Sequence, residues 1–264
     1  MPEWTKSPDA PIRISLLLFD RFSNLCLANC IEPLRAANTL AASQVFNWSI
    51  LTLDGSSSRS SSGIDILPQN AVTAMQNVDY LFILASYGYE AHDTAVTYRV
   101  LRMAARKTRC LVGFDAAPWL LASAGFLNGR RATVHWDLID RFSERFLQVE
   151  TERARVVRDG ACITCAGAMS ALEMTLDLIS EHLGMAARLD VEALFLQGDP
   201  PVQESGFANL ADPLVQRGLD FMRDRIEKPA TLTELARALS CQPRTLERRF
   251  RKSLGATPGA VYRH

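Results

Sequence analysis

The chain has 264 residues, about twice the most common domain size, so its length predicts two domains. Hydrophobic residues make up 48% and charged residues 22%, which excludes a disordered or a fibrous chain. The 29 basic and 29 acidic residues give a net charge of zero, but residues 217–264 hold eleven basic and five acidic side chains. An acidic body with a net charge of −6 therefore precedes a basic tail with a net charge of +6, and we expect the two parts to have different partners.

The N-terminal residues show no export or membrane signal. Residues 1–11 carry Glu3 and Asp9 and lack a basic segment followed by an apolar one, and the apolar run at residues 14–19 is too short to span a membrane. We therefore expect a cytoplasmic protein without a membrane partner. In that reducing compartment the six cysteines are expected to remain buried free thiols, and no cofactor is indicated.

Residues 11–197 alternate between strand and helix patterns. Strands are predicted at residues 12–19, 47–53, 78–85, 110–114 and 131–135, a hairpin at residues 155–157 and 161–164, and helices around residues 31–40 and at residues 94–107, 118–124 and 168–183. The six serines of residues 55–63 predict a flexible surface turn. This alternation is typical of an α/β domain with a doubly wound, mostly parallel sheet.

Residues 198–213 are rich in Gly, Pro and polar residues and are predicted to be a linker, after which residues 214–264 are purely helical. Thr231 and Glu234 form a capping-box pattern, so a helix is expected to start at Leu232. Residues 240–242 break that helix, and Pro243 suits the first turn of the next one. The order helix, short turn, helix indicates a helix-turn-helix.

The second of these helices separates charge from apolar surface. At 100° per residue, Leu246, Phe250 and Leu254 share one face, and cationic residues share the opposite one. Such a face can be merely a solvated surface, but in a helix-turn-helix this helix enters the major groove of DNA. We expect base contacts from Arg244, Thr245 and Arg248, and phosphate contacts from Arg249, Arg251 and Lys252.

The run A-T-L-T-E-L-A-R-A-L-S-C-Q-P-R-T-L-E-R-R-F-R-K-S-L-G-A-T-P, residues 230–258, resembles the first half of an AraC-type DNA-binding domain at nearly every position. That family carries two helix-turn-helix units joined by a long helix. The chain ends where the joining helix would begin, so the resemblance implies that residues 214–264 hold the first unit without the second. Double-stranded DNA is the implied partner.

The body also carries a resemblance. Its supporting stretches are I-E-P-L-R-A-A-N (residues 31–38), L-L-A-S-A-G-F-L-N-G-R-R-A-T-V-H-W (residues 120–136) and I-T-C-A-G-A-M-S-A-L-E-M (residues 163–174). In this order they resemble the PfpI-like domain of the class I glutamine amidotransferase-like superfamily, as fused to an AraC-type tail in regulators of the GlxA type. The resemblance implies a flavodoxin-like α/β fold for residues 11–197.

Enzymes of that superfamily place a nucleophilic cysteine on a sharp strand-to-helix turn. The corresponding turn here is V-G-F-D-A-A-P-W, residues 112–119, so Asp115 stands in the place of the cysteine. The acidic partner that the resemblance implies would fall near residues 25–28, where the sequence has no Asp or Glu. We therefore expect no amidase activity, and the chain is predicted not to be an enzyme.

Two interpretations of Asp115 are open. It can be the N-cap of the following helix, or it can belong to a small-molecule site at the carboxyl ends of the parallel strands, with Ala116, Trp119, His135, Trp136 and Tyr87. A carboxylate beside aromatic faces suits a cation. Related regulators with Asp at this turn sense betaine, carnitine or arginine, so the resemblance implies a cationic or zwitterionic nitrogen metabolite as effector.

Other candidates are weaker. The Cys162-x-x-Cys165 spacing fits a redox or zinc site, but no further ligands accompany it, so both cysteines are expected to be structural. Glu32, in an otherwise apolar helix, is either a pocket acid or a buried residue satisfied by backbone amides.

Together these features predict a DNA-binding transcription regulator, a homodimer through its N-terminal domain, with no metal. The alternative is an enzyme of the amidotransferase-like superfamily with an appended basic tail. Asp115 favours the regulator, because a cysteine at this position would have favoured the enzyme.

Overall fold

The computed structural model describes residues 10–196, 212–223, 230–254 and 257–261. The chain separates into two compact units, Met1–Gln197 and Gly198–His264, called here the sheet unit and the helical unit. Most of the predicted linker lies outside the described residues. Its last residue, Pro213, is the first residue of a helix, so the helical unit begins slightly earlier than the sequence pattern predicts.

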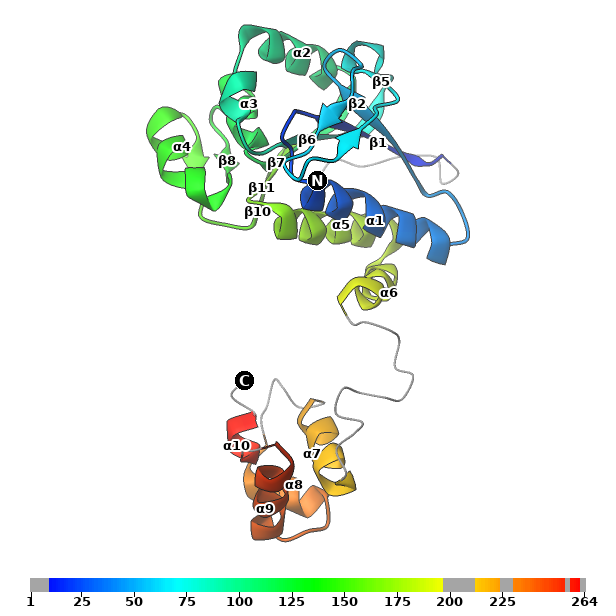
Figure 1. Cartoon of the computed structure of the whole chain (residues 1–264), viewed down its shortest axis with the longest axis vertical. Coiled ribbons are helices and arrows are strands. Elements are labelled where there is room, and N and C mark those ends of the chain that lie inside the picture. The colour runs from blue at the N-terminus through cyan, green and yellow to red at the C-terminus, as the bar shows by residue number, and fades with distance from the viewer. Residues whose placement is uncertain (1–9, 197–211, 224–229, 255–256, 262–264) are drawn as a thin grey trace. The chain divides into compact units, whose positions relative to one another are not determined.

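A seven-stranded sheet forms the centre of the sheet unit (Figure 1). In spatial order its strands are β10 (Val156–Asp159), β11 (Cys162–Cys165), β7 (Thr108–Asp115), β6 (Val78–Ala85), β1 (Ile12–Leu18), β2 (Phe46–Thr52) and β5 (Asn70–Ala71). All neighbours are parallel except β10 and β11, which form an antiparallel hairpin. The predicted doubly wound, mostly parallel fold is confirmed.

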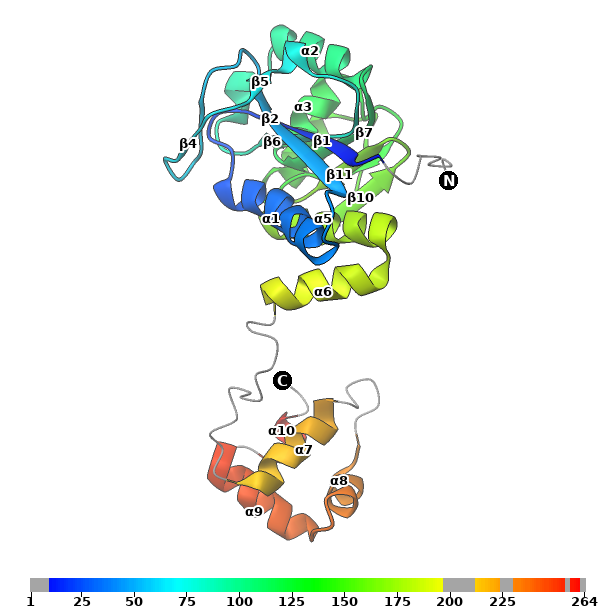
Figure 2. The same cartoon turned by 90° about the vertical axis from the view of Figure 1, so that its right-hand side faces the viewer.

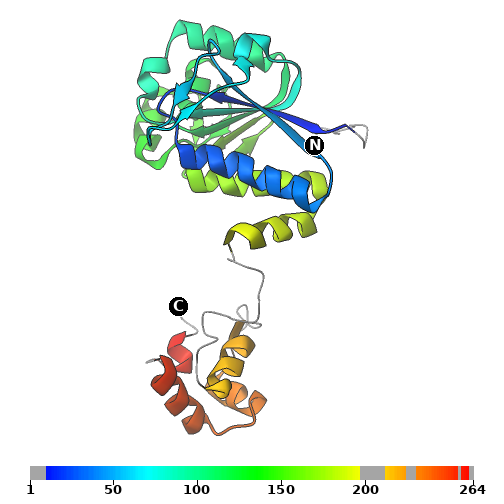
Figure 3. The same cartoon turned by 45° about the vertical axis from the view of Figure 1, so that its right-hand side comes forward.

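The central strands are buried because helices cover both faces of the sheet. The helices of this unit are α1 (Asn24–Leu40), α2 (Ala95–Ala105), α3 (Ala117–Ser123), α4 (Ile139–Arg145), α5 (Ala168–Leu183) and α6 (Met185–Leu196). Helices α1 and α5 lie side by side on one face, while α2 and α3 cover the other (Figures 2 and 3). Every residue of β6 is buried, Asp79 included, as expected for a central strand that is covered on both faces.

Three details differ from the sequence-based expectations. Residues 55–63 are not a free turn, because β3 (Ser58–Arg59) pairs with β4 (Asp65–Ile66) and the buried Ser58 donates a hydrogen bond of 2.8 Å to Asp20. The strand expected at residues 131–135 is only β8 (Arg131–Ala132), paired with β9 (Glu150–Thr151). Helices α4 and α6 and three short 3₁₀ helices, Val72–Ala74, Tyr89–His92 and Trp136–Leu138, were not expected.

The helical unit contains α7 (Pro213–Arg223), α8 (Leu232–Ala238), α9 (Pro243–Leu254) and α10 (Pro258–Val261). The capping box is confirmed: the Glu234 amide donates to the Thr231 hydroxyl and the Glu234 carboxylate accepts from the Thr231 amide. Ser240, with φ of 53°, makes the turn to α9. Leu246 and Phe250 are fully buried against α7 and α8, which confirms the apolar face of the second helix.

No helix in the described part of the chain is both long enough and apolar enough to cross a membrane.

Candidate functional site

Asp115 lies on a sharp turn between β7 and α3. Its φ of 62° is left-handed, a conformation that aspartate and asparagine adopt more readily than most residues. The turn is tight because α3 packs closely against β7. A Cβ atom at Gly113 would lie 2.8 Å from Leu121 Cδ1 and 3.2 Å from the Pro118 nitrogen. Glycine at this position is therefore what lets the helix start so close to the strand.

A hydrogen-bonded chain links three loops at the carboxyl end of the sheet. The Ser86 hydroxyl, at the end of β6, donates to the Asp115 carboxylate at 2.8 Å. The same hydroxyl accepts from the Ser23 amide at 3.0 Å, and the Ser23 side chain caps α1. Asp115 is therefore not the N-cap of α3, which is Ala116, and that interpretation is wrong. Its carboxylate instead fixes the Ser86 side chain between β6 and β7.

Burial raises the pKa of the Asp115 carboxyl above its ordinary value of 3.8, against smaller lowering effects of the Ser86 hydroxyl and of His135. Because the pKa is higher in the folded than in the unfolded chain, this group stabilises the fold fully below pH 3.8 and loses that contribution as the pH rises through the raised pKa. At neutral pH the ionised carboxylate is thus a destabilising group.

The variant Asp115→Asn is expected to melt at a higher temperature than the unmodified chain at pH 7. Asparagine keeps the left-handed conformation and the Ser86 hydrogen bond but cannot ionise. The advantage should shrink as the pH falls toward 4, because the Asp115 carboxyl of the folded unmodified chain, whose pKa is raised, then becomes protonated. Melting temperatures of both proteins between pH 4 and pH 8 test this. An asparagine variant that is less stable at pH 7, with an unchanged pH dependence, would contradict it.

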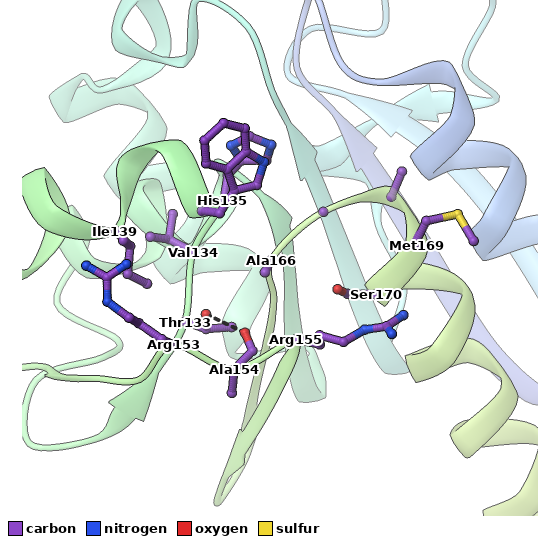
Figure 4. A pocket seen from close by; sticks show the side chains of 13 residues that line it. Thr133, Val134, His135, Ile139, Arg153, Ala154, Arg155, Ala166, Met169 and Ser170 are labelled. Atoms are coloured by element: carbon purple, nitrogen blue, oxygen red, sulfur yellow. Dashed lines mark hydrogen bonds between the residues drawn. The ribbon is translucent and has the colours of Figure 1, made fainter. Parts of the chain in front are cut away.

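A cavity of about 470 Å³ opens near this turn (Figure 4). Three segments supply its walls, and the lining residues are Thr133, Val134, His135, Trp136, Ile139, Arg153, Ala154, Arg155, Ala166, Gly167, Ala168, Met169 and Ser170. The volume falls within the range typical of small-molecule sites. The cavity is tied to the Asp115 turn through the backbone, since the His135 amide donates to the Asp115 carbonyl at 2.9 Å.

The structure brings only part of the predicted ligand site together. His135 and Trp136 line the cavity, and Trp136 is 73% exposed. Asp115, Ala116, Trp119 and Tyr87 are not among the lining residues. Trp119 packs in the core against Tyr89, Phe142 and Phe146 and donates its ring N–H to Asp93, while Tyr87 is exposed and Ala116 is buried. Proximity along the turn did not predict the direction of the Trp119 side chain.

Sequence reasoning missed the cationic and helix-terminal part of this cavity. Arg153 and Arg155 line it, and so do the first residues of α5. No Asp or Glu is among the lining residues. Two stretches of the sequence could have indicated this part of the cavity. They are R-A-R at residues 153–155, just before a strand, and A-G-A-M-S at residues 166–170, at the start of a long helix.

The second candidate surface is α9 of the helical unit. Arg244, Arg248, Arg251 and Lys252 are all exposed on it, and their side chains make no hydrogen bond or ion pair with any other described residue. Thr245 is half-buried at the start of the helix. The predicted separation of the charged and apolar faces therefore holds for these residues.

Arg249 differs from its neighbours on α9. Its guanidinium pairs with the Asp212 carboxylate at 3.0 Å. Asp212 also accepts from the Leu214 amide at 3.0 Å, at the start of α7. The pair thus joins α9 to α7 within the unit, and this contact argues against the predicted phosphate contact of Arg249. The sequence could not reveal the pairing, because Asp212 lies 37 residues earlier.

The structure resolves two further candidates. Cys162 and Cys165 are buried on opposite faces of the sheet, because side chains three residues apart on a strand point in opposite directions. They therefore cannot jointly bind a metal or form a disulfide, as expected for structural cysteines. Glu32 is half-exposed and pairs with Arg35 at 2.7 Å, so it is neither a pocket acid nor a buried residue held by backbone amides.

Residues 12–181 match the model of the DJ-1/PfpI family. The chain is 31% identical to the HTH-type transcriptional regulator CdhR of Pseudomonas aeruginosa, over 93% of this chain and 75% of that protein. It is 30% identical to the HTH-type transcriptional regulator GlxA of Rhizobium meliloti, over 92% of this chain and 78% of that protein. Among solved structures, an AraC family transcriptional regulator from Pseudomonas putida superposes with a TM-score of 0.61 and 25% identity, over 70% of this chain and 99% of that one.

Proposed function

This chain belongs to the DJ-1/PfpI family and to the HTH-type regulators that carry such a domain, and from this premise we propose that it is a DNA-binding transcription regulator acting in the cytoplasm. In this proposal the helical unit binds double-stranded DNA. The sheet unit senses a small-molecule effector and carries out no reaction.

The exposed cationic face of α9 is the observation that carries the proposal. Four cations stand free of any described partner on the second helix of a helix-turn-helix, while the opposite face holds the unit together through Leu246 and Phe250. Arg244 and Arg248 lie in the first half of the helix, the part that meets base edges in such motifs. Arg251 and Lys252 lie in the last turn, where phosphate contacts are the more suitable role.

The turn at Asp115 supports a role without catalysis. An aspartate on this strand-to-helix turn cannot perform thiol chemistry, and its carboxylate is committed to the Ser86 hydroxyl. All five buried cysteines belong to the two hydrophobic clusters of the sheet unit. Burial raises the pKa of both the Cys110 thiol, to about 12, and the Cys162 thiol, so neither is a reactive thiolate at neutral pH.

Regulation then requires that effector binding alter DNA binding. We infer that the chain forms a homodimer through its sheet unit, so that two helical units bind two half-sites of DNA. An effector that binds one arrangement of the dimer more tightly would shift the population toward it and so change which half-site spacing is bound.

DNA binding by the purified chain is expected to depend steeply on salt. Each phosphate contact contributes about −0.9 to the slope of log affinity against log salt. Arg251 and Lys252 therefore predict a slope near −2 for one chain and near −4 for the homodimer. Fluorescence anisotropy with a labelled duplex of about 30 base pairs, taken from DNA upstream of the gene for this chain and titrated between about 50 and 200 mM salt, measures it. A scrambled duplex is the control for specificity. Absence of binding at the lowest salt would contradict the proposal.

A further inference from the structure

We propose that the 470 Å³ cavity binds a small molecule through a carboxylate group, held by the start of α5, by the Ser170 hydroxyl and by Arg155. The inference rests on the proposed sensing role of the sheet unit and names the chemical class of its effector.

The start of α5 is open to an anion. The helix has sixteen residues, it begins at Ala168, and no side chain caps it. Among the described residues, the amides of Ala168, Met169 and Ser170 donate to no backbone acceptor, and all three residues line the cavity. Uncapped amides at the positive end of a helix dipole favour a negative group beside them.

Ser170 supplies the second, independent observation. Its side chain is buried, with 6% of the residue exposed, and it lines the cavity. Its hydroxyl has no hydrogen-bond partner among the described residues, and Figure 4 shows the oxygen directed toward the cavity. A hydroxyl without a partner among the described residues that is directed into the cavity is available to donate a hydrogen bond to an acceptor atom of a ligand. Thr133, the other buried hydroxyl of the lining, is already committed to the Ala154 carbonyl at 2.8 Å.

Arg155 supplies the charge. Its Nε pairs with Glu173 at 2.8 Å, while its two terminal nitrogens have no partner among the described residues. This ion pair with Glu173, on α5, uses only the Nε side of the guanidinium. Figure 4 shows the Arg155 side chain extending toward α5. A guanidinium donates paired hydrogen bonds to a carboxylate with good geometry. Arg153 is a weaker candidate, because a terminal nitrogen of its guanidinium is already paired with Asp140.

The other walls define what accompanies the carboxylate. Val134, Ile139 and the exposed Trp136 ring provide an apolar and aromatic surface. Because no acidic side chain lines the cavity, a ligand bearing only a cation has no counter-charge there. A zwitterion remains compatible, with its carboxylate at α5 and its nitrogen over the Trp136 ring. The carboxylate, and not the amine, is therefore the group that the cavity selects.

Two matched series of probes test this selection: benzoate, benzamide and benzylamine, and hexanoate, hexanamide and hexylamine. Calorimetric titration of the full chain without DNA, in a low-chloride buffer, gives the affinities. We expect the carboxylate of at least one series to bind about ten-fold or more tightly than its amide and amine. Equal binding by all three members of both series, or binding by none of the six, would overturn the proposal.

Variants locate the site. Arg155→Gln is expected to weaken carboxylate binding about ten- to a hundred-fold, and Ser170→Ala about three- to ten-fold. Arg155→Lys should retain part of the affinity, since it keeps the charge. The matched control is Arg99→Gln, an exposed arginine on α2 at the opposite face of the sheet, which should change nothing. Loss of affinity in the control, or none in Arg155→Gln and Ser170→Ala, would contradict the site.

The same variants separate this inference from the proposed function. Arg155→Gln should bind DNA like the unmodified chain when no probe is present, because Arg155 belongs to the sheet unit. Selective carboxylate binding without any effect on DNA binding would leave the site in place and refute its sensing role. Normal DNA binding with no carboxylate selectivity would refute the site alone.

Discussion

Replacing Arg248 with alanine is expected to weaken binding of the chain to its specific DNA by about 1–3 kcal/mol, a loss of about five- to 150-fold. Arg248 is exposed in the first half of α9 and has no partner among the described residues. Its guanidinium is therefore free to donate two hydrogen bonds to a guanine edge. Anisotropy titrations with the upstream duplex and with a scrambled duplex measure the loss, which should be larger on the specific sequence.

Arg251→Ala is the matched control for Arg248→Ala. It removes the same charge from the last turn of the same helix, so affinity should fall on both duplexes alike and the salt slope should become shallower by about 1. Neither variant should lower the melting temperature, since neither side chain is buried or paired within the described residues. Equal losses on specific and scrambled DNA for Arg248→Ala would show that it contacts phosphates and not bases.

Arg249 shows why the cationic face could be predicted from the sequence while individual roles could not. Arg248 and Arg249 are adjacent in the sequence and carry the same charge, so the sequence predicts a DNA contact for both. Only the fold reveals that Arg249 forms an ion pair with Asp212, next to α7, whereas the Arg248 side chain has no partner among the described residues. The direction of a surface side chain depends on which distant segment packs beside it, and periodicity within one helix carries no information about that segment.

In the sheet unit, too, the main elements could be predicted from the sequence, whereas the directions of individual side chains could not. The strands β1, β6 and β7 were predictable because buried parallel strands are short, mostly apolar runs. Strand β2 was predictable from its alternation, and α5 from its long apolar pattern. The cavity was only partly predictable. His135 and Trp136 follow a recognisable stretch, but Trp119 turns into the core, and the wall formed by Arg155 and Ser170 joins a loop and a helix start whose proximity depends on the β10–β11 hairpin between them.

The shortest strands and the order of the serine-rich segment could not be predicted from the sequence, for a physical reason. The two-residue strands β3 and β8 are too short to show a period, and each exists because a partner segment lies beside it. The serine-rich segment at residues 55–63 has the composition of a flexible loop, yet Asp20 accepts hydrogen bonds from both Ser58 and Arg59 and so fixes it. Composition describes what a segment prefers in isolation, whereas tertiary hydrogen bonds decide whether it is ordered.

Gly218→Leu is expected to unfold much of the helical unit. Gly218 lies in the middle of α7, where glycine costs about 1 kcal/mol relative to alanine. A Cβ atom there would lie 2.8 Å from Cζ and 2.9 Å from Cε2 of the buried Phe250 ring. These contacts are too short to tolerate, so the side chain must separate α7 from α9. Overpacking of this kind costs about 1–3 kcal/mol or more, and a core in a unit this small supplies only about 3–5 kcal/mol.

Two spectroscopic signals separate this effect from damage to the rest of the chain. All four tryptophans lie in residues 1–197, so tryptophan fluorescence follows the sheet unit, whereas circular dichroism at the helical band follows both units. Gly218→Leu should lose helical signal and DNA binding while the fluorescence melting temperature stays unchanged.

Gly218→Ala should have a smaller effect, because the better helix propensity of alanine offsets part of the clash. Adding Phe250→Leu to Gly218→Ala should recover stability, since the smaller side chain removes the ring atoms that the new Cβ meets. An unaltered helical signal in Gly218→Leu, or a parallel fall of the fluorescence transition, would contradict the close packing of α7 on Phe250.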